Sequence, residues 1–495
     1  MIIEPTGISD KIDQAFGPVV TFLEKVFFWD PVKALGISIE ADVPIVVLWL
    51  VLGGIFFTFR MKFINVRAFR HAFSILRGKY DKPGSKGEVS HFQALTTALS
   101  ATVGLGNITG VAIAITVGGP GATFWMILAG FFGMSLKFSE CTLGLKYRHI
   151  DEDGKVSGGP MYYLSKALKK RRLGMLGKVL AIFSAVMMVL ASFGGSNMLQ
   201  SNQSFVQAAT VIPALEGYGF WFGLGLSLLI IIVVFGGIKS IARVTSRLVP
   251  FMAVLYIGAA LVIIFINFRL VDDVFLLIIR SAFNPVALKG GIIGVIITGF
   301  RRGAFSNEAG VGSAAVAHAA AKTDEPVKEG IVAMLEPFID TVIICTMTSL
   351  VIIFTGFHAS GSGLEGTELT SAAFGSVFPW FPYLLVIAIL CFAFSTMISW
   401  SYYGLKGFNF LLGKSIRKLT GSKYLSNYIY YTFFLFFTVV GASSSLGNVI
   451  AFSDMMVLTM AFPNIIGLLI LAPEVAGDMK NYMSRLLKGE IARYS

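Results

Sequence analysis

Two glycines and an asparagine interrupt a hydrophobic stretch in the first quarter of the chain. Within residues 91–119, Gly104, Leu105, Gly106 and Asn107 stand between apolar flanks. A helix inside a bilayer can lose backbone hydrogen bonds only where the freed groups meet protein, water or ions. Close helix packing would explain either glycine alone, but the asparagine side chain can also cap a restarted helix. We therefore predict an unwound segment here whose backbone binds a ligand.

A helix broken at this point would turn opposite charges toward the gap. Its first half ends near Val103 with free carbonyl oxygens, which are hard ligands suited to Na⁺. Its second half begins near Asn107 with free N–H groups, which suit a carboxylate. The sequence thus predicts a site for an anionic group beside a site for a cation.

A second hydrophobic stretch is interrupted in a similar way. Residues 290–320 contain Gly299, Gly303 and Gly310, and we expect the helix to break near Gly299–Gly303. The carbonyl groups freed there would accept an ammonium group. Two broken helices in corresponding places are the best sequence indication of a transporter's binding site. Together they predict an α-amino acid held largely by the backbone, with an accompanying cation.

Other chemistries fit the sequence poorly. The glycine spacing lacks the last glycine of a dinucleotide motif and the acid about 20 residues downstream, and residues 236–240 lack the first glycine of a phosphate-binding loop. A membrane-embedded acyltransferase would need a histidine, alone or paired with an aspartate, near the membrane face. The histidines are scattered, so we expect no enzyme, and the three cysteines predict no disulfide framework. The histidines are His71, His91, His149, His318 and His358.

Composition indicates the class of protein that must position these residues. The chain has 495 residues, of which 55% are hydrophobic and 14% charged, with a mean hydropathy of +0.76. Soluble domains carry about 25% charged residues, so a soluble enzyme is excluded. The formal net charge of +12 could suggest nucleic acid as a partner. The basic residues are concentrated in particular loops, however, and this pattern indicates membrane topology instead.

Hydrophobic runs long enough to span a bilayer recur along the chain. A spanning helix needs about 20 apolar residues. By that criterion we expect eleven transmembrane helices, at residues 43–59, 91–120, 122–145, 177–208, 218–237, 246–268, 286–317, 329–356, 380–405, 425–443 and 446–472.

Every second loop between these spans is rich in Lys and Arg. Basic loops lie on the cytoplasmic side of a membrane, so we expect an extracytoplasmic N-terminus and a cytoplasmic C-terminus in a prokaryotic inner membrane. The acidic segment 1–42, with a short amphipathic stretch at 15–29, would lie outside the cell and on the membrane surface. The basic segments are 60–90, 146–178, 239–247, 406–423 and the tail after Pro473; the segments poor in Lys and Arg are 209–217, 269–285 and 357–379.

The two broken spans divide the rest of the chain into halves. If the first span is an extra helix, each remaining set of five begins with a broken helix, and an odd number gives the sets opposite orientation. We predict an all-α polytopic membrane protein with a 5+5 inverted repeat. The predicted regions are the extra helix 43–59, the basic cytoplasmic loop 60–90, the repeats 91–268 and 286–472, the extracytoplasmic connection 269–285 and the cytoplasmic tail 473–495.

Five blocks of sequence resemble the alanine/glycine:cation symporter family. The resemblance implies uptake of alanine or glycine together with Na⁺, or H⁺ in some members. It also implies the inverted-repeat fold of the sodium-coupled leucine transporter, preceded by one extra helix. The blocks are QALTTALSATVGLGNITGVAIAITVGGPGATFWM (93–126), KFSE (137–140), RRGAFSNEAGVGSAAVAHAAAKTDEPVKEG (301–330), FIDTVIICT (338–346) and FSTMISWSYYG (394–404).

The resemblance also assigns residues to the site. The amides of Leu105 and Gly106 would hold the substrate carboxylate. One Na⁺ site would be formed by carbonyls and hydroxyls of Ser100, Val103, Ser395 and Thr396, and a second by Thr102 and Asn107. After Asn107 this chain has Ile108-Thr109-Gly110 where the relatives have aromatic and arginine residues, so the extracellular gate of those relatives does not carry over.

Other polar and aromatic residues are candidates for substrate contacts. Gln200 lies in a span too polar to face lipid, where hydrogen bonding between helices is the alternative role. Near the second break, beside Gly303 and Ser306, Phe305 would cover the pocket and Asn307 would cap the second half-helix. Trp400, four residues after Thr396, would narrow the pocket for a small substrate. For the two aromatic side chains, core packing is the alternative.

Charged residues within spans are functional candidates by default. We expect Lys137 and Glu140 to pair, and Glu308 to neutralise Arg301 or Arg302. Asp340, with Glu336 one turn earlier, is the candidate for proton coupling if the cation is H⁺. We expect His318 to be a solvated helix-end residue at the cytoplasmic mouth.

These features predict a secondary active transporter. It would import alanine or glycine by symport with Na⁺ through alternating access. The alternative is an H⁺- or Na⁺-coupled symporter of another small neutral amino acid with the same fold.

Overall fold

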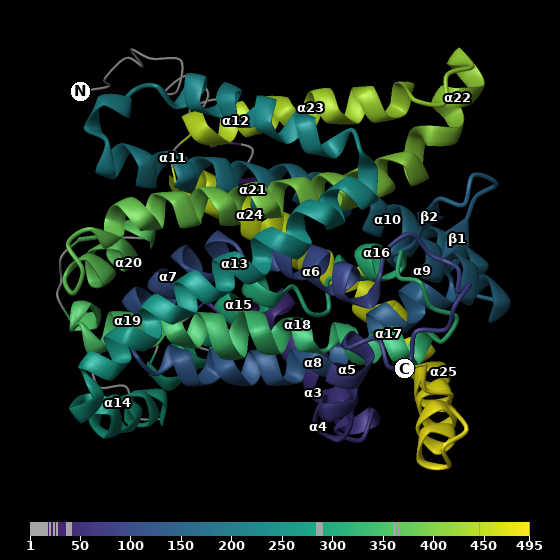
Figure 1. Ribbon diagram of the computed structural model, residues 1–495, viewed down its shortest axis with the longest axis horizontal. Helices are drawn as coiled ribbons and strands as arrows, with labels where there is room; N and C mark the ends of the chain where they lie inside the picture. The colour runs from purple at the N-terminus through teal and green to yellow at the C-terminus, as the bar shows by residue number, and fades with distance from the viewer. Residues whose placement is uncertain are drawn as a thin grey trace.

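The helices of this protein run roughly side by side, as Figure 1 shows for the computed structural model. The structure describes residues 28–35, 42–283, 291–359, 363–364, 366–444 and 446–494, and the isolated positions 18, 21, 22 and 25. Most of the amphipathic stretch predicted at 15–29 therefore lies outside the described residues. Within them, the only strands are β1 (His149–Ile150) and β2 (Val156–Ser157), an antiparallel pair with His149 opposite Ser157.

The first part of the chain forms the helices up to residue 283. They are α2 (Pro31–Ala34), α3 (Ile45–Arg60), α4 (Ile64–Arg67), α5 (Phe69–Leu76), α6 (His91–Thr102), α7 (Thr109–Gly118), α8 (Ala122–Lys146), α9 (Pro160–Lys170), α10 (Gly174–Phe193), α11 (Leu199–Val211), α12 (Gly219–Val234), α13 (Gly237–Ile266) and α14 (Val271–Phe283).

The second part begins at residue 291. Its helices are α15 (Gly291–Asn307), α16 (Ala314–His318), α17 (Pro326–Ala333), α18 (Leu335–Pro337), α19 (Thr346–Phe354), α20 (Gly366–Gly375), α21 (Phe381–Phe408), α22 (Lys414–Thr420), α23 (Leu425–Ser443), α24 (Leu446–Thr459) and α25 (Ala461–Leu487). Short 3₁₀ or π-helical segments link several of them, at Leu105–Asn107, Gly194–Met198, Pro213–Leu215, Phe268–Leu270, Phe338–Cys345, Phe357–Ala359 and Asn409–Gly413.

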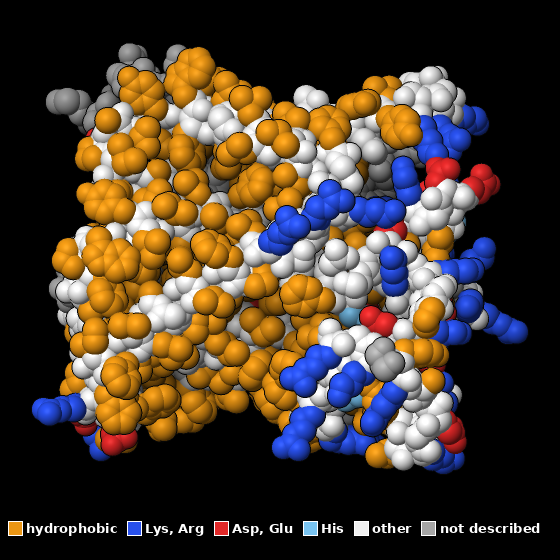
Figure 2. Space-filling view, in the orientation of Figure 1, with side chains coloured by type: hydrophobic (Ala, Val, Ile, Leu, Met, Phe, Trp, Pro, Cys, Tyr) orange, Lys and Arg blue, Asp and Glu red, His pale blue; other side chains and the backbone are white. Residues whose placement is uncertain are grey.

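The chain is a multi-pass membrane protein. Among the described residues, seven helices are long and apolar enough to cross a membrane, or eight if the bent pair α6 and α7 counts as one span. The apolar helices α3 and α12 are shorter. Large hydrophobic side chains cover the middle of the molecule, and Lys and Arg side chains gather toward the end that carries α9, α22 and α25 (Figures 1 and 2). The count of eleven and the repeat layout remain predictions.

The first predicted break is present. Helix α6 begins at a capping box formed by Ser90 and Gln93 and ends at Thr102. The chain continues through extended backbone at Gly104 (φ −151°, ψ −147°) and a 3₁₀ turn, and α7 then leaves at 58° to α6. Because glycine has no side chain, the chain can turn here in close contact with neighbouring helices.

The second break was predicted in the wrong place. Helix α15 passes unbroken through Gly299 and Gly303, and the unwound segment is residues 308–313. A Cβ atom on Gly299 would lie 2.6 Å from Trp125 Cβ, and one on Gly303 would lie 2.7 Å from Ala129 Cβ. These glycines therefore serve the close packing of α15 on α8, and no carbonyl is freed at Gly303.

Positive backbone φ angles mark the unwound segment itself. They are found at Glu308 (+53°), Gly310 (+93°) and Gly312 (+86°). Glycine adopts such angles without a steric penalty. Gly310 and Gly312 are therefore the glycines that allow the break.

Several helices lie in segments that were predicted to be connections, and two of these segments are extracytoplasmic in the prediction. Helix α14 lies within 269–285 and α20 within 357–379. Both are shorter than a membrane span and carry acidic residues, Asp272 and Asp273 in α14 and Glu368 in α20. A criterion based on apolar length alone therefore passes over them.

Candidate substrate and cation site

Asn107 connects the first break to the second broken region. Its Oδ1 accepts a hydrogen bond from the amide of Gly104 at 2.9 Å. Its Nδ2 lies 2.7 Å from Asp340 Oδ1 and 3.0 Å from Ser306 Oγ. One side chain thus fixes the turn after α6 and joins it to the end of α15 and to the π-helical segment Phe338–Cys345.

Asp340 is the centre of a buried polar cluster. Its Oδ2 accepts hydrogen bonds from Ser306 Oγ at 2.5 Å and from Thr341 Oγ1 at 2.8 Å. The thiol of Cys345 lies 3.1 Å from Ser306 Oγ. Asp340 and Thr341 have no exposed surface. A carboxylate with hydroxyl and amide oxygens nearby supplies the hard ligands that a small cation prefers.

Gln200 and Thr396 meet the other side of the break. The amide of Leu105 donates to Gln200 Oε1 at 3.3 Å, so the side chain predicted to contact substrate is bonded to an amide predicted to hold its carboxylate. Thr396 Oγ1 donates to the carbonyl of Ser100 at 2.9 Å. A Cβ atom on Gly104 would lie 2.6 Å from Thr396 Oγ1. Helices α11 and α21 therefore close around the unwound turn.

The structure brings only some of the predicted cation ligands together. Ser100 and Thr396 are in direct contact, and Ser100 Oγ also bonds Ser399 Oγ. Ser395, beside Thr396, donates to the carbonyl of Phe392 at 2.9 Å. Thr102 donates to carbonyls of its own helix, at 3.3 and 3.4 Å, and among the described contacts it has none with Asn107.

Phe305 and Asn307 lie at the end of α15. The position of a Cβ atom on Gly106 is 3.7 Å from Phe305 Cδ1, so the ring lies beside the turn. Asn307 Oδ1 accepts from the amide of Ala309 at 2.9 Å and its Nδ2 donates to Thr341 at 3.0 Å. Asn307 therefore holds the start of the unwound segment after α15, and the prediction that it caps the following half-helix was wrong because that helix begins only at Ala314.

Trp400 and Glu308 hold the unwound segment. The indole Nε1 of the fully buried Trp400 donates to Glu308 Oε1 at 3.1 Å, and Glu308 Oε2 accepts from Ser313 Oγ at 2.6 Å. Glu308 was expected to neutralise Arg301 or Arg302, but both arginines pair with Asp454 of α24 instead. No local pattern predicts this partner, which lies more than 150 positions from both arginines in the chain.

A chain of buried charges lies between the site and the basic end of the molecule. Lys137 Nζ is 2.9 Å from Glu336 and 3.9 Å from Glu140, so the expected pair exists but the closer partner is Glu336. His318 is fully buried, 2.5 Å from Glu329 and 4.0 Å from Glu336, and is not the solvated residue that was predicted. These contacts link α8, α16, α17 and α18.

Comparison with known proteins places the chain in a family. The model of the sodium:alanine symporter family matches residues 33–494. The sodium/alanine symporter AgcS of Methanococcus maripaludis is 42% identical over 444 residues, which cover 88% of this chain and 93% of the relative. The chain belongs to the sodium:alanine symporter family.

Other members of the family and one solved structure extend this result. The probable sodium/glutamine symporter GlnT of Bacillus subtilis is 38% identical over 446 residues, covering 88% of this chain and 87% of the relative. A crystal structure of MhsT in complex with L-phenylalanine matches with a TM-score of 0.51 and 16% identity, over 79% of this chain and all of that chain. That likeness shows a shared fold. Members of this family are symporters and not enzymes.

Two residues of the polar cluster, Thr341 and Cys345, were not predicted from the sequence. Thr341 and Cys345 follow Asp340 on the π-helical segment Phe338–Cys345. Thr341 bonds Asp340 and Cys345 bonds Ser306, both of which Asn107 also bonds. A regular helix gives no reason to expect residues one and five positions after Asp340 on its side. The π-helical turn changes that spacing, and such turns are frequent at functional sites.

Proposed function

We propose that this transporter imports alanine or glycine by symport with Na⁺, through alternating access. The observation that carries the proposal is the unwound turn at Gly104–Asn107, which is buried and surrounded by polar side chains from α11, α15 and α21. Family membership supports a cation-coupled amino-acid transporter. The geometry of the turn supports the substrate and ion assignments below.

The substrate carboxylate is assigned to the amide groups of the turn. Gly106 carries no side chain, and its Cβ position makes only ordinary contacts, with Ser306 at 3.6 Å and Phe305 at 3.7 Å. The amide of Leu105 is bonded to Gln200 Oε1, and a carboxylate would replace this amide oxygen as the acceptor. A charged acceptor makes the stronger hydrogen bond, so Gln200 would turn away when substrate binds and close again when it leaves.

A small side chain fits the walls of this pocket. Phe305 stands beside Gly106, and the fully buried Trp400 fills the space behind Glu308. The ammonium group is assigned to Ser306, whose hydroxyl oxygen faces the turn. These walls support alanine or glycine over larger amino acids.

The coupling ion is assigned to oxygen ligands at the turn. The carbonyls of Ser100 and Val103, with the hydroxyls of Ser395 and Thr396, form one set, and the carboxylate of Asp340, to which Asn107 donates, forms the second in place of Thr102. Substrate and ion both bind the same unwound turn, so each would stabilise the geometry that the other needs. Such coupling is reciprocal.

A second candidate keeps the fold and changes the ligands. The buried Asp340, bonded by Ser306 and Thr341, could carry a proton as the coupling ion. The relative GlnT is named a probable sodium/glutamine symporter, which makes another neutral amino acid the alternative substrate.

Uptake of labelled alanine into proteoliposomes tests the proposal. We expect uptake with an inward Na⁺ gradient and background levels when choline replaces Na⁺. Excess unlabelled glycine should compete, and glutamine should not. Uptake driven equally well by a proton gradient in choline would identify H⁺ as the coupling ion. Strong competition by glutamine would identify another neutral amino acid as the substrate.

A further inference from the structure

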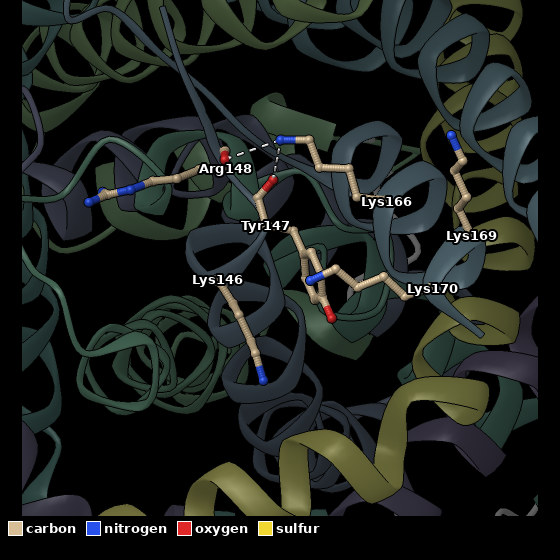
Figure 3. A pocket seen from close by; sticks show the side chains of 6 residues that line it. All are labelled: Lys146, Tyr147, Arg148, Lys166, Lys169 and Lys170. Carbon is tan, nitrogen blue, oxygen red and sulfur yellow. Dashed lines mark hydrogen bonds between the residues drawn. The ribbon is translucent and has the colours of Figure 1, made fainter.

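A basic hollow lies at the end of the molecule where α8, α9 and α25 meet, away from the transport site. It has a volume of about 590 Å³. Figure 3 shows its lining, in which Lys170 lies against the ring of Tyr147 while Lys166 reaches toward backbone oxygens of Tyr147 and Arg148. The lining residues are Lys146, Tyr147, Arg148, Lys166, Lys169 and Lys170.

Carboxylates neutralise one wall of this hollow only. On the side of α25, Lys146 pairs with Glu474 at 2.9 Å and with Asp478 at 2.5 Å. Tyr147 OH also donates to Glu474, at 2.6 Å. This wall is therefore balanced in charge.

The opposite wall carries positive charge without a carboxylate partner among the described contacts. Arg148 donates to backbone carbonyls, including those of Ala319 and Ala321 at 2.9 and 2.7 Å. Lys166 donates to the carbonyls of Tyr147 and Arg148 at 3.0 and 3.2 Å. Carbonyl oxygens satisfy the N–H groups of both side chains. Asp324 and Glu329 act on the charge of Arg148 from beyond ion-pair distance, whereas no carboxylate acts on that of Lys166 among the described contacts.

Lys166 lies close to another cation of the hollow, Lys170. Burial, and then the charge of Lys170, lower the pKa of Lys166 from its usual value. Lys169 and Lys170 are exposed at the end of α9 and are free to move toward a ligand. An anion in the hollow would meet several cations at once and relieve their repulsion.

The start of α10 beside the hollow exposes several apolar side chains, with Lys178 as the exposed charge of that helix. Helix α10 starts three residues after α9 ends and packs on it so closely that a Cβ atom on Gly177 would lie 2.7 Å from the carbonyl oxygen of Leu164. Its first turns expose hydrophobic side chains: Leu173 (40%), Met175 (78%), Leu176 (38%) and Val179 (53%). A molecule with an anionic head and apolar tails matches both surfaces.

We propose that the hollow binds the phosphate of an anionic phospholipid whose acyl chains lie along the start of α10. Basic pockets between helices at the cytoplasmic side of membrane proteins bind such headgroups. Lys169 and Lys170 contact the phosphate, while Lys166 and Arg148 supply the field behind it. A free phosphate ion would use the same cations but not the apolar surface.

Native mass spectrometry of the full-length purified transporter tests the proposal, with phosphatidylglycerol and phosphatidylcholine as the probes. We expect tighter retention of phosphatidylglycerol by the wild type. K169Q/K170Q should weaken it about 30-fold, because each cation near an anionic lipid contributes about 1 kcal/mol. K414Q/K418Q in α22 is the matched control, since it removes two exposed lysines from another helix at the same end.

Each other outcome would contradict the proposal. Equal retention of both lipids by the wild type would remove the headgroup preference, and equal weakening by both double variants would indicate diffuse surface charge. Thermal unfolding gives the third comparison: a shift produced by inorganic phosphate as large as that by phosphatidylglycerol would assign the hollow to a free anion. Because Lys169 and Lys170 lie far from the turn at Gly104–Asn107, loss of lipid binding and failure of alanine transport are separate results.

Discussion

At the scale of single residues, Asn107 makes more connections than its neighbours in the turn. It accepts from the amide of Gly104 and donates toward Asp340 and Ser306. Replacing it by leucine leaves the buried Asp340 without this donor, and an unsatisfied buried polar group costs about 1–3 kcal/mol. We expect Asn107→Leu to abolish alanine uptake while the protein still folds.

Proteoliposome uptake and a thermal unfolding curve check this prediction together. Asn267→Leu is the control, because Asn267 bonds only the carbonyl of Ile263 among the described contacts, at the end of α13. Uptake by Asn107→Leu at the control's level would refute the role of Asn107.

Gly104 and Gly106 differ in what a methyl group would meet. At Gly104 a Cβ atom would lie 2.6 Å from Thr396 Oγ1, which is bonded to the carbonyl of Ser100. At Gly106 the nearest atom is Ser306 Cα at 3.6 Å, an ordinary contact. We expect Gly104→Ala to reduce uptake of both substrates about tenfold or more, since an overpacked site costs about 1–3 kcal/mol.

Gly106→Ala should have a selective effect. The added methyl group narrows the space beside Phe305, so glycine uptake should fall less than alanine uptake. The measured quantity is the ratio of glycine to alanine uptake in the two variants and the wild type. An unchanged ratio in Gly106→Ala would place the substrate elsewhere.

Between elements, Asp454 of α24 holds the start of the second broken region. It pairs with Arg301 at 2.8 Å and also with Arg302, which is almost completely buried. Removing one partner of a buried ion pair costs about 3–5 kcal/mol because a buried charge remains. We expect Asp454→Asn to lose stability on this scale, measured as the free energy of unfolding in denaturing detergent.

The pair Arg485–Glu325 provides the comparison. Its side chains are 37% and 33% exposed, at a similar distance of 2.9 Å. Partly exposed pairs contribute about 1 kcal/mol or less, so Glu325→Gln should be nearly neutral. A loss in Asp454→Asn no larger than in Glu325→Gln would show that the arginines find another partner.

The same elements show how far sequence reasoning reaches. The string at Gly104–Asn107 identified the first break because a costly asparagine and two glycines coincide in an apolar span. For the second break, Gly299 and Gly303 looked equivalent to Gly310, and only contact with α8 separates packing glycines from those with positive φ. The prediction that His318 is solvated was wrong for the same reason, because its burial depends on helices whose positions the sequence does not specify.

Across the whole molecule, hydropathy located the long apolar helices, whereas the buried polar cluster could not be predicted in this way. Apolar length is a local property, so α8, α13, α21 and α23 fall inside or around their predicted spans. The polar cluster joins Asn107, Ser306 and Asp340, which are far apart in the chain. Such a cluster follows from packing, which no single stretch of sequence specifies.

The orientation of the molecule in the membrane is the remaining global prediction. Lys and Arg gather at the end with α9, α22 and α25 (Figure 2), and basic loops favour the cytoplasm. Thr210 at the end of α11 and Thr420 at the end of α22 are both exposed threonines in last turns, at opposite ends of the molecule (Figure 1). Two variants, each with one cysteine introduced at one of these positions, form a matched pair.

In intact cells, we expect a membrane-impermeant maleimide to label Thr210→Cys and to leave Thr420→Cys unlabelled until the membrane is permeabilised. The wild type gives the background, which should be low because Cys141 and Cys345 are buried and Cys391 is only partly exposed. The reverse pattern would place the basic end outside the cell. Substrate would then first meet the half of the molecule that holds His318 and Glu329, and the assignment of that half to the inner side would fail.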